Sequence, residues 1–363
     1  MLVGCRSFEE DTPAPPIGAC GDVPEPGTFL GVVPFASEAN VTFDVPVGDG
    51  LDGRLFTDLA RLPLETKVVD NDRFYIRTRY PDRIDPNAPW RLVVAGKPID
   101  LAALRAQPMG EVLLECSGNT IDGRFGLLST ASWSGVPLLD VLARETAVDP
   151  NALVLVSGFD QHSQPSQRSI PGASWIFSVR DLERAGAFLA LEMNGAPLPR
   201  DHGAPIRLVM PGWYGCTCIK WVDTIAIVNA DEPSTPHMRE FASRTMQNGI
   251  PDLARDFAPA SIDHAATAVR VERWRVDGEI VHRVIGIMWG GDRPTDKLAL
   301  RFADGPPERV VLCPSTSTRT WTWFTHVWRG KQTGLVSIRA VVEDPSLRTR
   351  RLANGHYTRS ILV

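Results

Sequence analysis

Cys116 is the residue whose type and setting most directly offer chemistry. It follows the apolar run 112–114 and opens a turn of small residues, Ser117, Gly118 and Asn119. A strand that ends in such a turn leaves its thiol at the end of a sheet with little to cover it. A thiolate is a ligand for soft metals and becomes a nucleophile when its pKa is lowered. Most single cysteines in an apolar context are inert core residues, so the motif alone leaves both interpretations open.

A second cluster, residues 194–221, places His202, Arg207 and Lys220 among glycines and prolines. Convergent Arg, Lys and His donors are what a buried phosphate or another anion requires, and Arg binds it in a bidentate fork. The alternative is a set of solvated surface charges. Cys216 and Cys218 are separated by one residue, which predicts that they share one face of a strand as packing residues.

A third cluster, residues 74–79, reads Phe-Tyr-Ile-Arg-Thr-Arg. The period of a strand predicts that Arg77 and Arg79 point to the same face. That face is either solvent or an anion pocket.

Composition limits the class of protein. With 363 residues, 43% hydrophobic and 22% charged, the chain is long enough for two globular domains. A net charge of −5 without a long basic run argues against nucleic acid as a partner. No apolar stretch approaches the roughly 18 residues of a membrane span. The six cysteines show neither zinc spacing nor a covalent haem motif.

The elements that must position these clusters divide into two groups. From about 70 to 230, helices are predicted over 137–144 and 179–185, and strands over 153–156 and 206–210, which is a mixed α+β pattern. From about 265 onward the chain alternates in the manner of strands, with Val336, Ile338 and Ala340 on one face. About seven such strands favour an immunoglobulin-like β-sandwich. The proline-rich segment 231–265 is predicted to connect the two parts.

Together the three clusters resemble the sulfite oxidase family of molybdopterin enzymes. Residues 74–79 are similar to a cofactor-binding strand of that family, residues 115–119 and 133–138 to its molybdenum-ligand motif and the helix after it, and residues 194–221 to its cofactor-binding motif. The resemblance covers roughly residues 60–363. It implies an α+β chain with an irregular arm (1–60), a mixed α/β molybdopterin-binding catalytic domain (61–235), and a linker with an immunoglobulin-like dimerisation domain (236–363).

The resemblance also implies a role for individual residues. Cys116 is the expected protein ligand of molybdenum, and Arg77 is expected to reach both the cofactor and the substrate. Arg293 is a candidate substrate arginine from the sandwich, and Trp133 is a candidate pocket wall or simply a core residue. The residues expected to hold the molybdopterin cofactor are Tyr75, Ile76, Arg77, Thr78, Arg79, Asp160, His202, Arg207, Cys218, Ile219 and Lys220.

The chain departs from the family pattern at several positions. Ile121 and its neighbours supply no basic residue directly after the cysteine motif, Phe241 lies where a substrate-side tyrosine is expected, and Arg79 replaces a histidine.

The family reaction implied is two-electron oxidation of sulfite or a related sulfur compound by oxygen-atom transfer at a Cys-ligated molybdenum. The alternatives are a sulfoxide-type reductase of the same superfamily and a non-enzymatic scaffold that has lost the metal.

The resemblance sets expectations about partners as well. A small anionic sulfur compound is the expected substrate and a second copy of the chain the expected oligomeric partner. No haem or flavin signature is visible, so an external acceptor such as a c-type cytochrome is expected to take the electrons. Residues 2–5 look like a lipoprotein cleavage site without its charged and apolar regions. The sequence as written therefore predicts the cytoplasm, and a truncated N-terminus would predict the periplasm.

Overall fold

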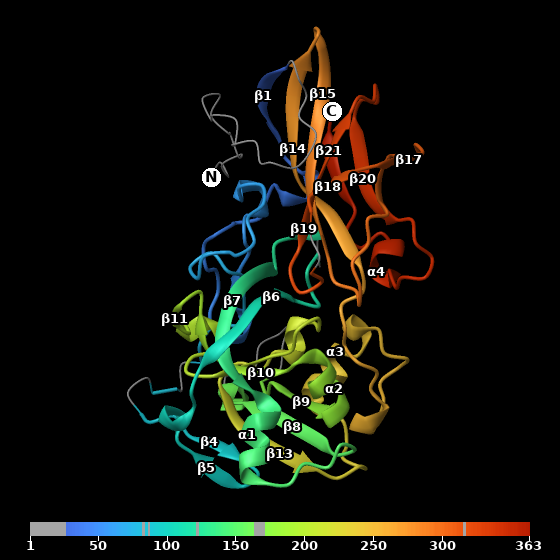
Figure 1. Cartoon of the computed structure of the whole chain (residues 1–363). Coiled ribbons are helices and arrows are strands. Elements are labelled where there is room, and N and C mark those ends of the chain that lie inside the picture. The colour runs from blue at the N-terminus through green and yellow to red at the C-terminus, as the bar shows by residue number, and fades with distance from the viewer. Residues whose placement is uncertain (1–26, 82–83, 86–87, 121–122, 163–170, 315–316) are drawn as a thin grey trace.

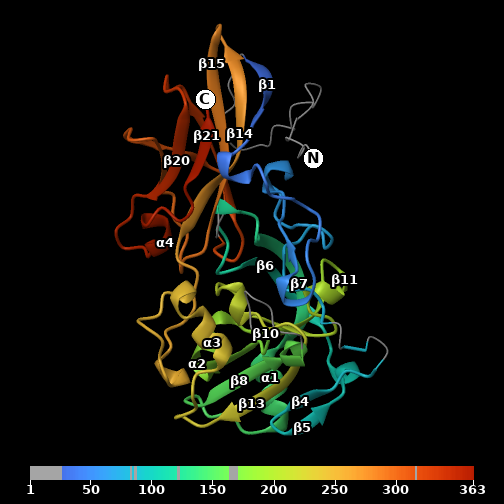
Figure 2. The ribbon, with the colours of Figure 1, turned by 180° about the vertical axis from the view of Figure 1, so that it is seen from behind.

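The structure is a computed structural model that describes residues 27–81, 84–85, 88–120, 123–162, 171–314 and 317–363. Ile121 and the first 26 residues of the predicted arm lie outside the described residues. Figures 1 and 2 show an elongated molecule in which a β-sandwich forms one end and a mixed α/β part forms the other. The long hairpin of β6 and β7 lies between the two ends.

Two sheets form the mixed α/β part. One has the strand order β5-β4-β13-β8-β9; the other has the order β11-β10-β7-β6, with β12 also paired to β10. A separate pair, β2 and β3, lies beside them. The bounds are β2 Arg54–Leu55, β3 Ile76–Arg77, β4 Leu92–Val94, β5 Lys97–Ile99, β6 Gln107–Glu115, β7 Leu128–Pro137, β8 Leu153–Gly158, β9 Ser174–Ser178, β10 Phe188–Met193, β11 Ala196–Pro197, β12 Arg207–Val209 and β13 Val222–Val228.

Two further sheets form the sandwich. Their strand orders are β1-β14-β15-β19-β18 and β17-β16-β20-β21. The bounds are β1 Thr28–Val33, β14 Ala265–Val276, β15 Glu279–Trp289, β16 Leu298–Phe302, β17 Pro307–Arg309, β18 Val311–Leu312, β19 Thr322–Trp328, β20 Leu335–Val342 and β21 Arg359–Leu362. Part of the predicted arm is thus a strand, because β1 pairs antiparallel with β14. The predicted alternation holds in β20, where Val336, Ile338 and Ala340 are buried.

Four short α-helices complete the described chain: α1 Leu138–Glu145, α2 Val179–Ala185, α3 Pro236–Phe241 and α4 Arg350–Ala353. Helix α2 has the predicted bounds because both of its ends are encoded. The Ser178 hydroxyl accepts a hydrogen bond from the N–H of Asp181, and Gly186 ends the helix with a φ of 65°. Helix α3 begins in a similar way, with the Thr235 hydroxyl accepting from the N–H of Met238.

The hairpin of β6 and β7 contributes side chains to two hydrophobic cores. Side chains along a strand alternate between its faces. Val112 and Leu114 therefore join the core of the mixed α/β part, whereas Leu113 joins the core of the sandwich. Leu128 on β7 also lies in the sandwich core. The strand that precedes Cys116 is consequently fixed from both sides.

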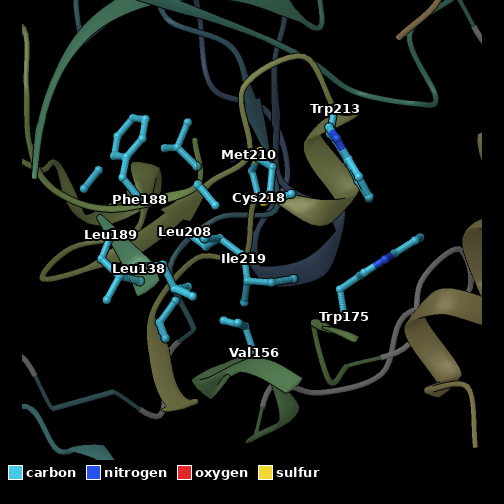
Figure 3. Packing of buried hydrophobic residues seen from close by; sticks show 14 of the residues in the cluster. Leu138, Val156, Trp175, Phe188, Leu189, Leu208, Met210, Trp213, Cys218 and Ile219 are labelled. Carbon is cyan, nitrogen blue, oxygen red and sulfur yellow. Dashed lines mark hydrogen bonds between the residues drawn. The ribbon is translucent and has the colours of Figure 1, made fainter. Parts of the chain in front are cut away.

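The core beneath the candidate site is closely packed. Figure 3 shows Leu208, Met210, Cys218 and Ile219 together, with Val156 nearby. The prediction that Cys216 and Cys218 share a face of a strand is wrong. Cys216 lies in a 3-10 turn over Gly215–Thr217 and Cys218 follows as its C-cap, since the chain must turn sharply after Pro211 and Gly212.

Candidate active site

One pocket brings together residues from all three sequence clusters. The predicted site residues that line it are Tyr75, Arg77, Thr78, Cys116, Asp160, His202, Arg207, Cys218, Ile219 and Lys220. Sequence segments that are more than 100 residues apart therefore converge on one place, as the anion-pocket interpretation requires.

Cys116 lies at this pocket on a tightly tied turn. It is 5% exposed, and its Sγ accepts a hydrogen bond from the N–H of Gly118 at 3.3 Å. The buried Asn119 side chain closes the loop, because its Oδ1 accepts from the N–H groups of Gly126 and Leu127 at 3.2 and 3.1 Å. A thiol on so constrained a turn has one defined position relative to the pocket.

Arg207, which is buried, and Lys220, which is half-buried, provide positive charge at the pocket. The Arg207 guanidinium donates to the carbonyl oxygens of His202 at 2.9 Å and Cys218 at 3.2 Å. The Lys220 Nζ donates to the carbonyl oxygens of Asp201, at 2.8 Å, and Thr78. Burial lowers the pKa of Lys220 well below its ordinary value, and the nearby Arg207 lowers it further. Two desolvated cations side by side are costly unless an anion joins them.

Two glycines allow this close packing. Gly203 has a φ of 115°, and a Cβ there would lie 2.9 Å from the Arg207 Cβ. A Cβ on Gly215 would lie 2.6 Å from the Tyr75 hydroxyl oxygen and 3.1 Å from the carbonyl oxygen of Glu115. Both positions require glycine, because the backbone approaches the pocket-lining residues too closely to leave room for a side chain.

His202 and Asp160 complete the polar lining. The His202 Nε2 lies 2.7 Å from the carbonyl oxygen of Asn71, and burial lowers the pKa of this histidine to about 4. Asp160 accepts a hydrogen bond from the N–H of Ala173 at 2.6 Å. Burial raises the pKa of Asp160 to about 6, against the lowering effect of that hydrogen bond and of Lys220.

Arg77 and Arg79 do not face the same way, which corrects the sequence prediction. Strand β3 ends at Arg77 because Thr78 has a φ of 79°, and the chain turns there. Arg77 lines the pocket and donates to the carbonyl oxygen of Leu51 at 2.8 Å. Arg79 instead forms ion pairs with Asp201 and Asp49, each at 3.2 Å, outside the pocket lining.

Three other predicted site residues also lie outside the pocket lining. Ile76 is buried in the core, where its neighbour on β2 is Leu55. Trp133 is buried behind the pocket, with the Arg207 guanidinium 5.4 Å from its ring, so it supports a lining residue instead of being one. Arg293 is exposed on the sandwich and donates to Ser346, which does not favour its predicted contact with substrate.

Helix α3 contributes two pocket residues that the sequence analysis missed, His237 and Glu240, together with Phe241 from the position where a substrate-side tyrosine was expected. The His237 ring stacks on Phe241 at 4.8 Å, and burial lowers the pKa of His237 to about 4. Its Nε2 is buried without a hydrogen-bond partner. The only available signal was Pro236 at the start of a helix in the predicted connection; it indicates a helix but not which of its faces meets the pocket.

The residues present fit an anionic organic cofactor that also carries a metal. The buried Nε of Arg207 has no hydrogen-bond partner, although it lies next to the pocket, and an unmatched buried donor of this kind suits a phosphate oxygen. Among the described residues, no three His, Cys, Asp or Glu side chains converge as a metal site. A metal at Cys116 would accordingly take its other ligands from the organic group.

The chain is similar to several known proteins. Residues 78–236 match the family described as oxidoreductase molybdopterin binding domain. The mitochondrial sulfite oxidase of Macaca fascicularis is 29% identical over 290 residues, which cover 71% of this chain and 52% of that protein. That of Mus musculus is 29% identical over 301 residues, covering 74% and 53%. Residues 78–236 therefore form an oxidoreductase molybdopterin-binding domain, and the chain is similar to sulfite oxidases.

The solved structure of the sulfane dehydrogenase SoxCD from Paracoccus pantotrophus has a fold similar to that of this chain. The TM-score is 0.59 at 18% identity, over 86% of this chain and 81% of that chain. The predicted α+β class with a molybdopterin-binding domain is therefore confirmed, while the immunoglobulin-like description of the sandwich and the domain boundaries stay predictions. The chain spans about half the length of the curated relatives it matches. Within the described residues, no helix has the length and apolarity needed to cross a membrane.

Proposed function

We propose that this chain oxidises sulfite or a related small sulfur anion by oxygen-atom transfer at a molybdenum held by molybdopterin and by the Cys116 thiolate. The observation that carries the proposal is the convergence of Cys116, Arg77, Arg207 and Lys220 on one pocket. The names of the sulfite oxidase relatives agree with a sulfur oxyanion as substrate.

Arg207 and Lys220 would hold the phosphate of the cofactor. Arg207 is buried and Lys220 is half-buried, and the Arg207 side chain is kept in place by the carbonyl oxygens of His202 and Cys218. Their charges repel each other in the absence of an anion, so binding a phosphate relieves an unfavourable interaction. Tyr75, Thr78, Asp160, His202, Cys218 and Ile219 would surround the rest of the cofactor.

Cys116 would supply the protein ligand, and Arg77 would orient the substrate. A thiolate suits a soft or high-valent metal, and the buried turn excludes water from its sulfur. Arg77 is close enough to Cys116 for its pKa to respond to the thiol, although burial is the larger influence and lowers it. A fixed guanidinium beside the metal ligand attracts an oxyanion and needs no reorganisation during the reaction.

The bound cofactor would supply oxygen-atom transfer and accept two electrons. We further propose that an external acceptor such as a c-type cytochrome takes these electrons, and that two chains pair through their sandwich domains.

The direct test compares sulfite-dependent reduction of cytochrome c with dye-driven reduction of sulfoxides by the same purified protein. The proposal predicts the first activity and its loss in Cys116→Ser, with the fold retained. Sulfoxide reduction without sulfite oxidation would favour the reductase alternative. Full sulfite oxidation by Cys116→Ser would refute the role given to the thiolate.

A further inference from the structure

Glu115, the residue directly before Cys116, is a fully buried acid that the proposed chemistry does not use. Its relative exposure is 0%. Its Oε2 accepts a hydrogen bond from the Trp289 Nε1 at 2.9 Å, and its Oε1 accepts one from the Tyr357 hydroxyl at 2.8 Å. The Asn119 side chain adds a longer contact at 3.5 Å. The carboxylate therefore joins the Cys116 loop to two aromatic residues of the sandwich.

The alternation of strand β6 explains why neighbouring residues face different parts of the molecule. Cys116 points to the pocket and the mixed α/β core, as Val112 and Leu114 do. Glu115 points the other way, to the side where Leu113 enters the sandwich core. Any movement of Glu115 toward or away from the sandwich must move the adjacent thiol within the pocket.

The two donors are themselves well fixed. Trp289 ends strand β15, and Tyr357 lies between α4 and β21. Their rings meet edge to face with centroids 5.1 Å apart, and both are about 2% exposed. A carboxylate that accepts from two immobile donors in a dry site has one preferred position.

The segment around α4 holds the other side of the same loop. The Arg351 guanidinium donates to the carbonyl oxygen of Ser117 at 2.8 Å and also to that of Arg244, in the segment after α3. The His356 Nε2 lies 2.9 Å from the carbonyl oxygen of Asn119 and 2.6 Å from the Thr120 hydroxyl oxygen. The sandwich thus contacts the loop both before and after Cys116.

We infer that Glu115 is a positioning residue through which the sandwich domain sets the place of the Cys116 thiol in the pocket. The carboxylate does not touch the reacting groups; it acts through the backbone of the next residue. The consequence for turnover rests on the proposed function, whereas the placing of the thiol does not. A purely structural role would stabilise the whole chain without any particular effect on Cys116.

The experiment measures alkylation of individual cysteines by iodoacetamide in the full-length, cofactor-free chain, followed by mass spectrometry of peptides. Glu115→Ala is compared with Glu115→Gln, which keeps an acceptor for Trp289 and a polar group for Tyr357. Glu111→Ala, on the same strand β6 and only partly buried, is the matched control. Cys218 serves as an internal reference because it is buried and free in the same core.

We expect Glu115→Ala to raise the alkylation rate of Cys116 at least tenfold, with the rate of Cys218 unchanged. Glu115→Gln and Glu111→Ala should stay within about threefold of the wild type. An unchanged Cys116 rate in Glu115→Ala, or equal increases at Cys116 and Cys218, would overturn the inference. If Glu115→Ala does not fold, Tyr357→Phe removes one donor while keeping the ring, and Cys116 must then show a selective rise.

A second readout separates this inference from the proposed function. In chains loaded with cofactor, Glu115→Ala should retain less than half of the molybdenum that the wild type retains after dialysis, and Glu111→Ala should retain all of it. A wild type without molybdenum would refute the proposed function and leave the alkylation result intact. Equal retention in Glu115→Ala and the wild type would overturn the expected consequence for the metal, whereas the alkylation rates decide whether Glu115 places the thiol.

Discussion

His202 should make the cofactor-free protein sensitive to acid. Burial lowers the pKa of His202 to about 4 in the folded chain, whereas an exposed histidine has a pKa of about 6.5. A group with a lowered folded pKa stays neutral in the fold while the unfolded chain takes up a proton. Its contribution is therefore fully present above pH 6.5 and is lost as the pH falls toward 4.

The two pKa values give the size of the effect. At pH 4.5 an unfolded histidine is almost fully protonated and His202 is still mostly neutral, which corresponds to a loss of about 2.5 kcal/mol relative to pH 7. The substitution His202→Gln removes this titration and keeps an N–H donor for the carbonyl oxygen of Asn71. Between pH 7 and pH 4.5, the free energy of unfolding should fall by about 2.5 kcal/mol less in the variant than in the wild type.

Urea unfolding at the two pH values, followed by tryptophan fluorescence, measures the difference. His237 is a companion case, since burial also lowers its pKa to about 4, and the double variant His202→Gln/His237→Gln should be the least sensitive to acid. If the free energy of unfolding falls equally in the wild type and in His202→Gln between pH 7 and pH 4.5, the reasoning is refuted. So would a histidine NMR titration that places His202 near 6.5 in the folded protein.

Three other substitutions test the construction of the site. Asn119→Ala removes the acceptor of two backbone N–H groups and should lower the free energy of unfolding by about 2–4 kcal/mol, measured with urea. Arg207→Lys loses the fork that binds two carbonyl oxygens and should reduce retained molybdenum at least tenfold after gel filtration. Gly215→Ala places a methyl group 2.6 Å from the Tyr75 hydroxyl oxygen and should cost about 1–3 kcal/mol of stability in the same unfolding assay.

Local patterns were sufficient for much of the fold. The predicted helix at 179–185 is confirmed because Ser178 and Gly186 encode its two ends, and the alternation in 336–342 is confirmed in β20. The strand predicted for Cys216 and Cys218 is wrong, because a spacing of two residues does not distinguish a strand from a turn. Pairing of β1 with β14 joins residues more than 200 positions apart, and no local pattern reports such a contact.

The candidate site, too, could be predicted from local patterns only in part. Cys116, Arg207 and Lys220 were recognisable because each lies in a dense motif, and the structure brings them to one pocket. Arg79 was misplaced because the positive φ of Thr78 ends the strand at Arg77, two residues before Arg79. His237 was missed because its contribution depends on how α3 packs. That packing is a tertiary property.

The central claim is that the pocket at Cys116 holds a molybdenum cofactor. The most direct test is the molybdenum content per chain of protein purified from a host that makes the cofactor, with Cys116→Ser in parallel. The account predicts close to one atom per chain in the wild type and a reduced content in the variant. Well-folded wild-type protein without molybdenum would contradict the account and favour a scaffold that has kept the fold of the family.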